Sequence, residues 1–271
     1  MLSSDNCINV SVANVYREPT FKSEVVTQAL LGETIITLGK EEQWYHIRLW
    51  DGYEGWINEF YTTRVDKEVS ENIKSNETFI VDDLFGAVHE KPDSSTPIIR
   101  DLVFGNMLIV LDRKDGWSEV LLPDGEVGWT NSKHRSKPEG NIRDYLEKQA
   151  KRFLGVQYLW GGKSPKGFDC SGFVQTVMKS ADILFPRDAS MQENYSKLID
   201  IEFEDIQKGD LFFFSIEKRG IDHVALSLGE KKFIHCSGFV KIESFDSHDP
   251  KYNERLYHRI RSVKSIQEFC R

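Results

Sequence analysis

Short apolar runs alternate with turn-forming residues throughout the first half of the chain. Residues 34–38 and 107–111 are β-branched and apolar, which favours extended strands. Asp-Gly stands between strand-like runs at 51–52 and again at 124–125, where it predicts tight hairpin turns. The pattern therefore predicts an all-β first half made of short strands and hairpins.

The same pattern occurs twice, at a constant offset of 73 residues. At this offset, apolar positions and several identical residues align without a gap. The identical pairs are Pro19 with Pro92, Gly32 with Gly105, Trp44 with Trp117, Asp51-Gly52 with Asp124-Gly125, and Gly55-Trp56 with Gly128-Trp129. We interpret residues 8–63 and 80–135 as two copies of one small barrel of five or six strands.

The second half of the chain begins with a change of periodicity. Residues 132–140 are polar and contain Pro and Gly, as linkers do, and residues 63–76 form a charged connector between the two copies. From Asn141, which can cap a helix, apolar positions follow helical spacing up to Gly155. The same spacing returns over residues 173–181 and predicts a second helix.

Strand signals follow these helices. Residues 211–214 are uniformly apolar and predict a buried strand. Residues 222–228 and 231–235 flank Gly229-Glu230 and predict the two arms of a hairpin. Helices followed by paired strands predict an α+β domain after the linker.

Composition and charge restrict the possible partners. The chain has 271 residues, with 43 Asp or Glu against 35 Lys or Arg and a net charge of −8. This balance argues against nucleic acid or an anionic membrane as a partner, and no apolar run approaches the roughly 18 residues of a membrane helix. No basic segment with an apolar core precedes Arg17, so we expect no signal peptide and a cytoplasmic protein.

The cysteines predict free thiols. Four of them, at positions 7, 170, 236 and 270, are too few and too scattered for a disulfide framework. No pair of Cys or His residues has the spacing of zinc ligands. We expect thiols in a reducing compartment, and neither a metal nor a cofactor.

One of these thiols stands where a nucleophile is expected. Cys170 lies where a glycine-rich loop enters a helix, and a helix N-terminus lowers the pKa of a thiol. A nucleophile needs a base, and the predicted hairpin offers His223. A three-residue loop centred on Gly229 would place His223 opposite His235, with both imidazoles on one face. A two-residue loop would instead pair His223 with Cys236.

Six blocks in a fixed order then establish a resemblance. They are Tyr158-x-Trp160-Gly161-Gly162, Asp169-Cys170-Ser171-Gly172, Pro186-Arg187-Asp188-Ala189-x-x-Gln192, Gly209-Asp210-Leu211, Asp222-His223-Val224, and His235. Together they resemble the NlpC/P60 family of papain-like cysteine peptidases over about residues 141–262. The repeated glycine and tryptophan pattern of the first half resembles the bacterial SH3 family.

The resemblance implies catalytic roles. Cys170 corresponds to the nucleophile, His223 to the base and His235 to the third member that orients the base. Tyr158 corresponds to a tyrosine whose hydroxyl lies at the oxyanion site, beside the backbone N–H of Cys170.

It also implies a substrate pocket. Asp169, Ser171 and Asp188 correspond to residues that line a dipeptide pocket, while Ala189 stands where some relatives have serine. In relatives with two SH3-like modules, the first module closes over the pocket and meets the amine end of the substrate. The corresponding residues are Glu18 and Tyr53. The second copy has Lys91 and Glu126 at these positions, as expected if only the first copy is specialised.

The resulting prediction is a multi-domain protein with two all-β SH3-like barrels followed by an α+β papain-like domain. The predicted boundaries are residues 1–66, residues 67–137 including a linker, and residues 138–271. The resemblance implies a γ-D-glutamyl-L-diamino acid endopeptidase. Its substrates would be murein tri- and tetrapeptides with a free N-terminal L-Ala, carrying Lys or diaminopimelate in third place, and it would release L-Ala-γ-D-Glu.

Three other functions stay open from the sequence. The chain could be a secreted hydrolase of intact wall, anchored to peptidoglycan by its barrels. It could be a non-catalytic binding protein for cell-wall peptides, although the complete set of Cys170, His223 and His235 argues against this. It could also be a transferase that passes the acyl group to an amine instead of water.

Overall fold

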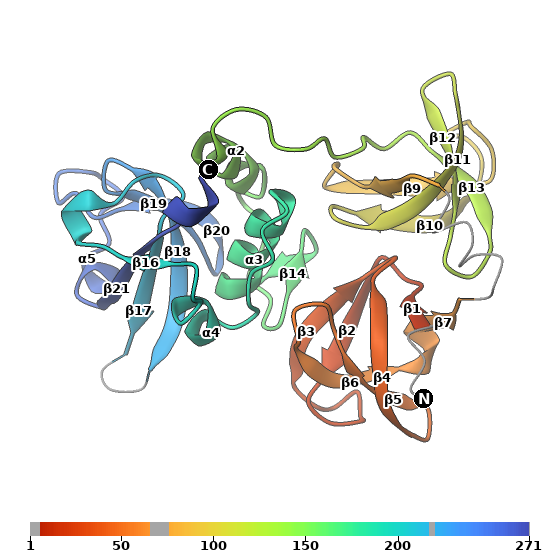
Figure 1. Ribbon diagram of the computed structural model, residues 1–271, viewed down its shortest axis with the longest axis horizontal. Coiled ribbons are helices and arrows are strands. Elements are labelled where there is room, and N and C mark those ends of the chain that lie inside the picture. Colours follow the sequence, from red (N-terminus) through yellow and green to blue (C-terminus); the bar gives the residue numbers. More distant parts are fainter. Residues whose placement is uncertain (1–5, 66–75, 217–219, 271) are drawn as a thin grey trace. The chain divides into compact units, whose positions relative to one another are not determined.

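The computed structural model describes residues 6–65, 76–216 and 220–270 and divides into two compact units, Met1–Ser136 and Lys137–Arg271 (Figure 1). The N-terminal unit consists of strands, and the C-terminal unit combines helices with a sheet. This confirms the predicted fold class. The charged connector predicted at 63–76 falls largely outside the described residues.

The first barrel of the N-terminal unit is one seven-stranded sheet, in the order β3-β2-β6-β5-β4-β1-β7. Its strands are β1 (Asn6–Ile8), β2 (Val12–Tyr16), β3 (Val25–Leu30), β4 (Thr34–Glu41), β5 (Trp44–Arg48), β6 (Glu54–Asn58) and β7 (Thr62–Arg64), with a 3-10 helix at Glu59–Tyr61. The second barrel has the order β10-β9-β13-β12-β11-β8. Its strands are β8 (Thr78–Ile80), β9 (Phe85–His89), β10 (Ile98–Val103), β11 (Met107–Lys114), β12 (Trp117–Leu121) and β13 (Val127–Thr130).

The repeat in the sequence is a repeat in the structure. Four strands of the first barrel, β2 to β5, have counterparts β9 to β12 that begin and end 73 residues later. The predicted hairpin turns are present, with Gly52 at φ 80° and Gly125 at φ 88°. These positive values explain why glycine stands at both positions.

Two further glycines mark a close approach of strands in each barrel. A Cβ on Gly55 of β6 would lie 2.7 Å from Cγ1 of Val15 and 2.9 Å from the carbonyl oxygen of Tyr16. A Cβ on Gly128 of β13 would meet Val88 and the carbonyl of His89 in the same way, at 2.6 and 2.8 Å. The glycine of the repeated Gly-Trp pair is therefore required by packing between neighbouring strands.

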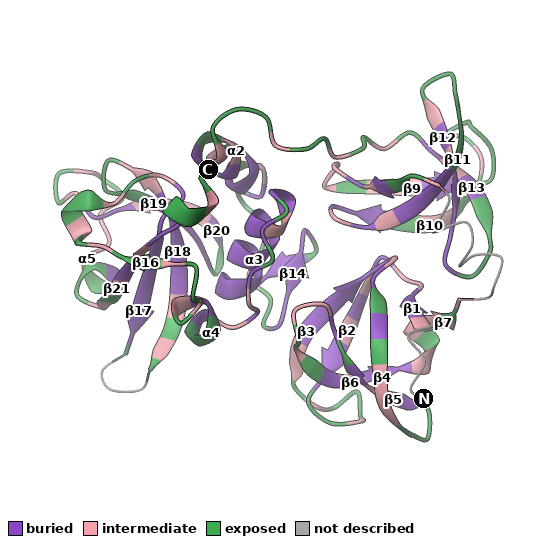
Figure 2. Cartoon of the chain, in the orientation of Figure 1, coloured by how far each residue is buried: buried purple, intermediate pink, exposed green. Residues whose placement is uncertain are grey.

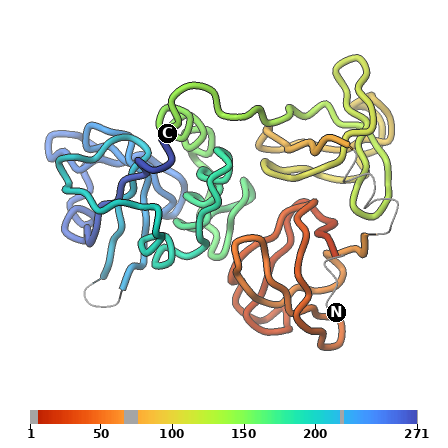
Figure 3. Tube along the Cα trace, viewed as in Figure 1, coloured from red at the N-terminus to blue at the C-terminus, as the bar shows by residue number. Residues whose placement is uncertain are grey.

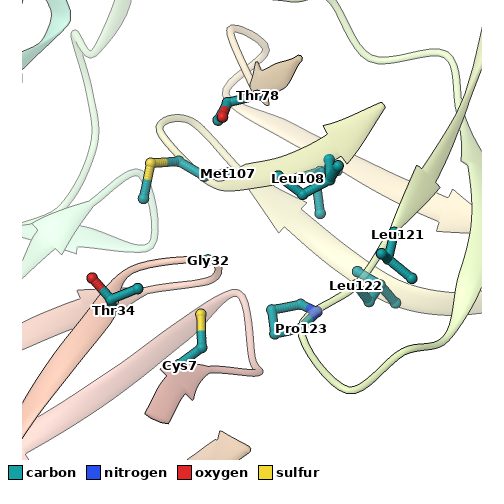
Figure 4. A pocket seen from close by; sticks show the side chains of 10 residues that line it. Cys7, Gly32, Thr34, Thr78, Met107, Leu108, Leu121, Leu122 and Pro123 are labelled. Carbon is teal, nitrogen blue, oxygen red and sulfur yellow. The ribbon is translucent and has the colours of Figure 1, made fainter. Parts of the chain in front are cut away.

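The two barrels of this unit are joined directly. The backbone N–H of Met107 donates to the carbonyl of Leu31 at 2.9 Å, and the Asn106 amide donates to the carbonyl of Ser11 at 2.8 Å. A mostly apolar cavity of about 210 Å³ lies beside these contacts, with Cys7 and Gly32 from the first barrel on its wall (Figure 4). Its other lining residues are Thr34, Thr78, Met107, Leu108, Ile109, Leu121, Leu122 and Pro123.

The C-terminal unit is a six-stranded antiparallel sheet with helices, traced in Figure 3, in the order β16-β21-β17-β18-β19-β20. The strands are β16 (Ile199–Asp200), β17 (Leu211–Ser215), β18 (Ile221–Gly229), β19 (Lys232–Ser237), β20 (Phe239–Ser244) and β21 (Ile260–Ser265). A small ribbon, β14 (Lys163–Ser164) with β15 (Gly167–Phe168), precedes the second helix. The helices are α2 (Ile142–Arg152), α3 (Cys170–Ser180), α4 (Ala189–Glu193) and α5 (Glu254–Tyr257), with 3-10 turns at Phe203–Asp205 and Gln267–Phe269.

The core of this unit lies between α3 and the sheet. Nearly every residue of α3 is buried, and so is the whole of β17 (Figure 2). The predicted cap of the first helix is present, since the Asn141 side chain accepts from the N–H of Arg143 at 2.8 Å. Burying α3 on all sides holds its first residue in a defined place. None of the helices in the described parts of the chain has the length and apolar character needed to span a membrane.

Candidate active site

Cys170 is the first residue of α3, and two local features determine its position. The Asp169 carboxylate caps the helix by accepting a hydrogen bond from the N–H of Gly172 at 2.6 Å. A side chain on Gly172 would collide with the carbonyl oxygen of Gly162, so glycine is needed for the preceding loop to approach the helix. The Asp-Cys-Ser-Gly block is thus a structural unit that holds the thiol.

The Cys170 thiol is buried against β18. The residue is 8% exposed, and the backbone N–H groups of Val224 and Ser171 interact with the sulfur. Burial, together with the neighbouring Asp169 carboxylate, raises the pKa of the thiol to about 12. This differs from the lowered pKa expected from the sequence, because desolvation of a thiolate here outweighs the attraction of the helix N-terminus.

His223 and His235 lie on neighbouring antiparallel strands, β18 and β19. The paired residues are Leu226 with Ile234, Ser227 with Phe233, and Gly229 with Lys232. Both predicted registers are therefore wrong, because the ladder is shifted and a bulge lies between Ser227 and Gly229. The shift leaves His223 diagonal to His235, and an offset of two residues keeps both side chains on one face. His223 Nε2 lies 2.7 Å from His235 Nδ1.

The two imidazoles differ in exposure, since His235 is buried and His223 is partly exposed. Desolvation lowers the pKa of His223 to about 3, and a positive charge on neighbouring His235 would act in the same direction. Cys236, the next residue along β19, turns to the other side of the strand, where its thiol donates to the carbonyl of Phe168 at 3.1 Å.

A carboxylate stands behind the histidine pair. His235 Nε2 lies 2.9 Å from Oε2 of Glu243, and the Asn253 amide donates to the same oxygen at 2.6 Å. Lys241 Nζ lies 3.1 Å from the other oxygen. Burial alone would raise the pKa of Glu243, but the hydrogen bonds from His235, Asn253 and Lys241 outweigh it and hold the pKa at about 2.

Sequence reasoning missed Glu243, although a signal for it exists. Ser237-Gly238 marks a turn, after which β20 runs back along β19 and pairs Lys241 with His235. Side chains two residues apart on a strand share a face, which places Glu243 on the face of His235.

Tyr158 lies close to the thiol. The residue is half-buried, and its backbone N–H donates to the carbonyl of Gly238 at 2.8 Å. Burial, followed by the influence of Cys170, raises the pKa of the hydroxyl above its ordinary value. A raised pKa keeps the phenol protonated, so it can donate a hydrogen bond to an oxygen near the sulfur.

Asp169 and Ser171 are tied together by a buried arginine. Arg187 is 1% exposed, and its guanidinium donates to both oxygens of Asp169 and to Oγ of Ser171. Gly161 N–H also donates to Asp169, at 3.0 Å. The Gln192 amide donates to the carbonyl of Ser171 at 3.0 Å. The Pro-Arg-Asp-Ala-x-x-Gln block thus braces the nucleophile loop, a role that the sequence did not reveal.

Asp188 occupies a different position from its neighbour Arg187. It precedes α4 and is partly exposed, and its side chain does not cap that helix. The Arg187 guanidinium pairs with the Asp169 carboxylate, 18 residues earlier in the chain.

Glu18 and Tyr53 lie in the first barrel. Glu18 is exposed in the loop after β2, and Tyr53 follows the Asp51-Gly52 turn, with its N–H donating to Asp51 at 3.0 Å. Both interact electrostatically with Arg17. Their part in substrate binding stays a prediction.

Comparison with known proteins agrees with this arrangement. Residues 155–262 match the NlpC/P60 family, and residues 11–62 and 84–134 each match the bacterial SH3 domain. The chain is 28% identical to dipeptidyl-peptidase 6 of Lysinibacillus sphaericus, over 94% of this chain and 97% of that protein. It is 32% identical to a gamma-D-glutamyl-L-lysine dipeptidyl-peptidase of Bacillus cereus, over 80% of this chain and 68% of that protein. The crystal structure of an NlpC/P60 family protein from Bacillus cereus superimposes with a TM-score of 0.80 at 25% identity, covering 97% of this chain and 99% of that one.

Proposed function

Since this chain belongs to the NlpC/P60 family of cysteine peptidases, we propose that it hydrolyses the γ-D-glutamyl-L-diamino acid bond of murein peptides and releases L-Ala-γ-D-Glu. The observation that carries the proposal is the buried thiol of Cys170 against the strand that presents His223, with His235 2.7 Å behind it. The name of the similar gamma-D-glutamyl-L-lysine dipeptidyl-peptidase of Bacillus cereus supports the choice of bond. We further propose that the substrates are cytoplasmic recycled peptides with a free N-terminal amine.

Before the attack on the substrate, the Cys170 thiol and the His223 imidazole are both uncharged. The high pKa of Cys170 and the low pKa of His223 both favour the thiol and the uncharged imidazole. As the γ-carbonyl carbon of D-Glu meets the sulfur, the thiol proton passes to His223 and the new C–S bond forms. The carbonyl electron pair moves onto oxygen, and we assign the N–H of Cys170 and the hydroxyl of Tyr158 to hold the oxyanion.

Collapse of this intermediate splits the peptide. The C–N bond breaks, and His223 returns its proton to the departing amine of the diamino acid. Water, deprotonated by His223, then attacks the thioester. The C–S bond breaks as the acid is released, and His223 returns its proton to the Cys170 sulfur. His235 stays hydrogen-bonded to the base throughout and stabilises its charged form.

The free amine of the substrate is the proposed specificity element. Asp188 is partly exposed beside the nucleophile loop and is the carboxylate we assign to the ammonium. Asp169 and Ser171 form the wall of the pocket, held by Arg187. We assign Glu18 and Tyr53 to the same ammonium on the resemblance.

The test is mass spectrometry of L-Ala-γ-D-Glu-L-Lys, and of its diaminopimelate analogue, incubated with wild-type protein and with Cys170→Ala. A parallel sample carries the same peptides N-acetylated. We expect L-Ala-γ-D-Glu from the free peptides only, and none from Cys170→Ala, because the thiol is the nucleophile.

Cys270→Ala is the matched control, since this cysteine is exposed near the end of the chain and should be dispensable. Equal cleavage of free and acetylated peptides would discard the amine requirement and favour a hydrolase of intact wall. Full activity in Cys170→Ala would contradict the mechanism.

A further inference from the structure

The donor and the acceptor can be assigned in each hydrogen bond that links Glu243, His235 and His223. Glu243 is ionised over the ordinary pH range, so its oxygens can only accept. The hydrogen of the 2.9 Å contact must therefore belong to Nε2 of His235. A neutral His235 then carries a lone pair on Nδ1, the atom that faces His223.

The same logic determines the state of the base. With His235 in this neutral form its Nδ1 accepts, so the 2.7 Å contact is a donation from Nε2 of His223. A neutral His223 protonated at Nε2 has its lone pair on Nδ1, the ring nitrogen left for Cys170. With the opposite tautomers, His223 would present an N–H to the thiol and could not take its proton.

We infer that Glu243 is a positioning residue of this enzyme, which sets the tautomers of His235 and His223 so that the base faces Cys170 ready to accept a proton. The inference rests on the proposed function, and it extends the catalytic set by a carboxylate that does not touch substrate. When His223 is protonated during attack, the negative charge of Glu243 also stabilises the cation through His235.

Glu243 is itself held in one orientation. The Asn253 amide donates to the oxygen that accepts from His235, and Lys241 contacts the other oxygen. Asn253 also caps α5, where its side-chain oxygen accepts from the N–H of Leu256 at 2.9 Å. A carboxylate with a fixed orientation imposes a fixed tautomer on its partner.

Solvent can reach this carboxylate. Glu243 lines a polar cavity of about 610 Å³, and its side chain is 18% exposed. Glu147 and Asp249 line the same cavity. A small carboxylate can therefore enter the space that truncation of Glu243 would leave, and this makes chemical rescue possible.

The experiment compares Glu243→Ala, Glu243→Gln and Glu147→Ala in the full chain. We expect Glu243→Ala to lower kcat/KM for L-Ala-γ-D-Glu-L-Lys about 100-fold, by analogy with other orienting partners of catalytic or ligating histidines. Added formate should raise the kcat/KM of Glu243→Ala at least tenfold, and this effect should saturate as the formate concentration increases. Glu243→Gln, whose amide oxygen still accepts a hydrogen bond, should retain intermediate activity.

Glu147→Ala is the matched control, a carboxylate of the same cavity that does not contact the histidines, and formate should not change its activity. Unchanged kcat/KM in Glu243→Ala would overturn the inference. So would a loss of activity that formate does not relieve, because a merely structural role predicts that result.

A second readout does not need the substrate. Long-range ¹H–¹⁵N spectra of histidine-labelled protein report which ring nitrogen carries hydrogen, and His223→Gln and His235→Gln variants assign the signals. We expect both rings protonated at Nε2 in the wild type, and a changed tautomer in Glu243→Ala that formate reverses. Unchanged tautomers would overturn the inference, whereas the expected spectra with no peptide cleavage would mean that only the proposed substrate is wrong.

Discussion

At the scale of single residues, the site is organised by desolvation. Burial raises the pKa of Cys170 to about 12, and burial with the neighbouring His235 lowers that of His223 to about 3. The two pKa shifts are opposite in sign but have the same effect, since each group is held in its uncharged form through neutral pH. The resting site is a thiol beside an imidazole, and the thiolate forms only as the proton moves to His223.

This charge state predicts the pH dependence of alkylation. Only the thiolate reacts with chloroacetamide, and the thiolate fraction rises about tenfold per pH unit below the pKa. The rate for Cys170 should therefore increase about tenfold per unit between pH 7 and pH 9 without a plateau. Peptide mass spectrometry follows the Cys170 peptide, with the exposed Cys270 as an internal reference in the same sample. A plateau for Cys170 at neutral pH would indicate a thiolate–imidazolium pair instead.

At the scale of elements, a few glycines decide how the strands meet. Gly55 and Gly128 occupy equivalent positions, and each leaves room for a valine side chain and a carbonyl of the neighbouring strand. The repetition of the same contact in both barrels shows that it belongs to the packing of the module. Gly39 of β4 differs, because a Cβ there would meet nothing nearer than the Cβ of His46, at 4.0 Å.

Gly55→Ala and Gly39→Ala form a matched pair. We expect Gly55→Ala to lower the free energy of unfolding by about 1–3 kcal/mol, the usual effect of overpacking. Gly39→Ala should be neutral or stabilising by up to about 1 kcal/mol, because alanine restricts the unfolded chain. Urea unfolding followed by tryptophan fluorescence measures both, since all tryptophans except Trp160 lie in the N-terminal unit. Equal midpoints for the two variants would contradict the packing argument.

The hairpin that carries the histidines shows the limit of local reasoning about elements. The turn places Glu230 and Lys231 at positive φ, 50° and 60°, although neither is a residue that turns of this kind favour. The sequence pattern pointed to Gly229-Glu230 instead. The register follows from the bulge and from pairing with the neighbouring strands β17 and β20. The residues of the turn carry no information about either of these.

At the scale of the whole molecule, two copies of one module have diverged at selected positions. The copies share the boundaries of four strands and their framework glycines. They differ at position 18, where the second copy has Lys91, and at position 53, where it has Glu126. Divergence at exposed or half-exposed positions within a common framework is expected when only one copy has acquired a binding role.

Paired substitutions test this difference. We predict that Glu18→Gln and Tyr53→Phe each raise the KM for L-Ala-γ-D-Glu-L-Lys about tenfold or more, because a hydrogen bond to a charged group is lost. The equivalent changes in the second barrel, Lys91→Gln and Glu126→Gln, should leave KM unchanged. Steady-state kinetics of the four variants gives the comparison, and similar effects in both barrels would remove Glu18 and Tyr53 from the proposed site.

The sequence by itself determined the repeat, the all-β nature of its two copies, the helix that begins at Cys170 and the family of the C-terminal domain. These features depend on local spacing, caps and turn residues, so the sequence alone predicts them. Only the tertiary structure decided that Arg187 pairs with Asp169, that His223 lies diagonal to His235, and that burial reverses the expected shift in the pKa of Cys170. It also placed Glu243 behind His235. Each of these depends on segments distant in the sequence meeting in a desolvated interior, where the strength of charges and hydrogen bonds is set by what surrounds them.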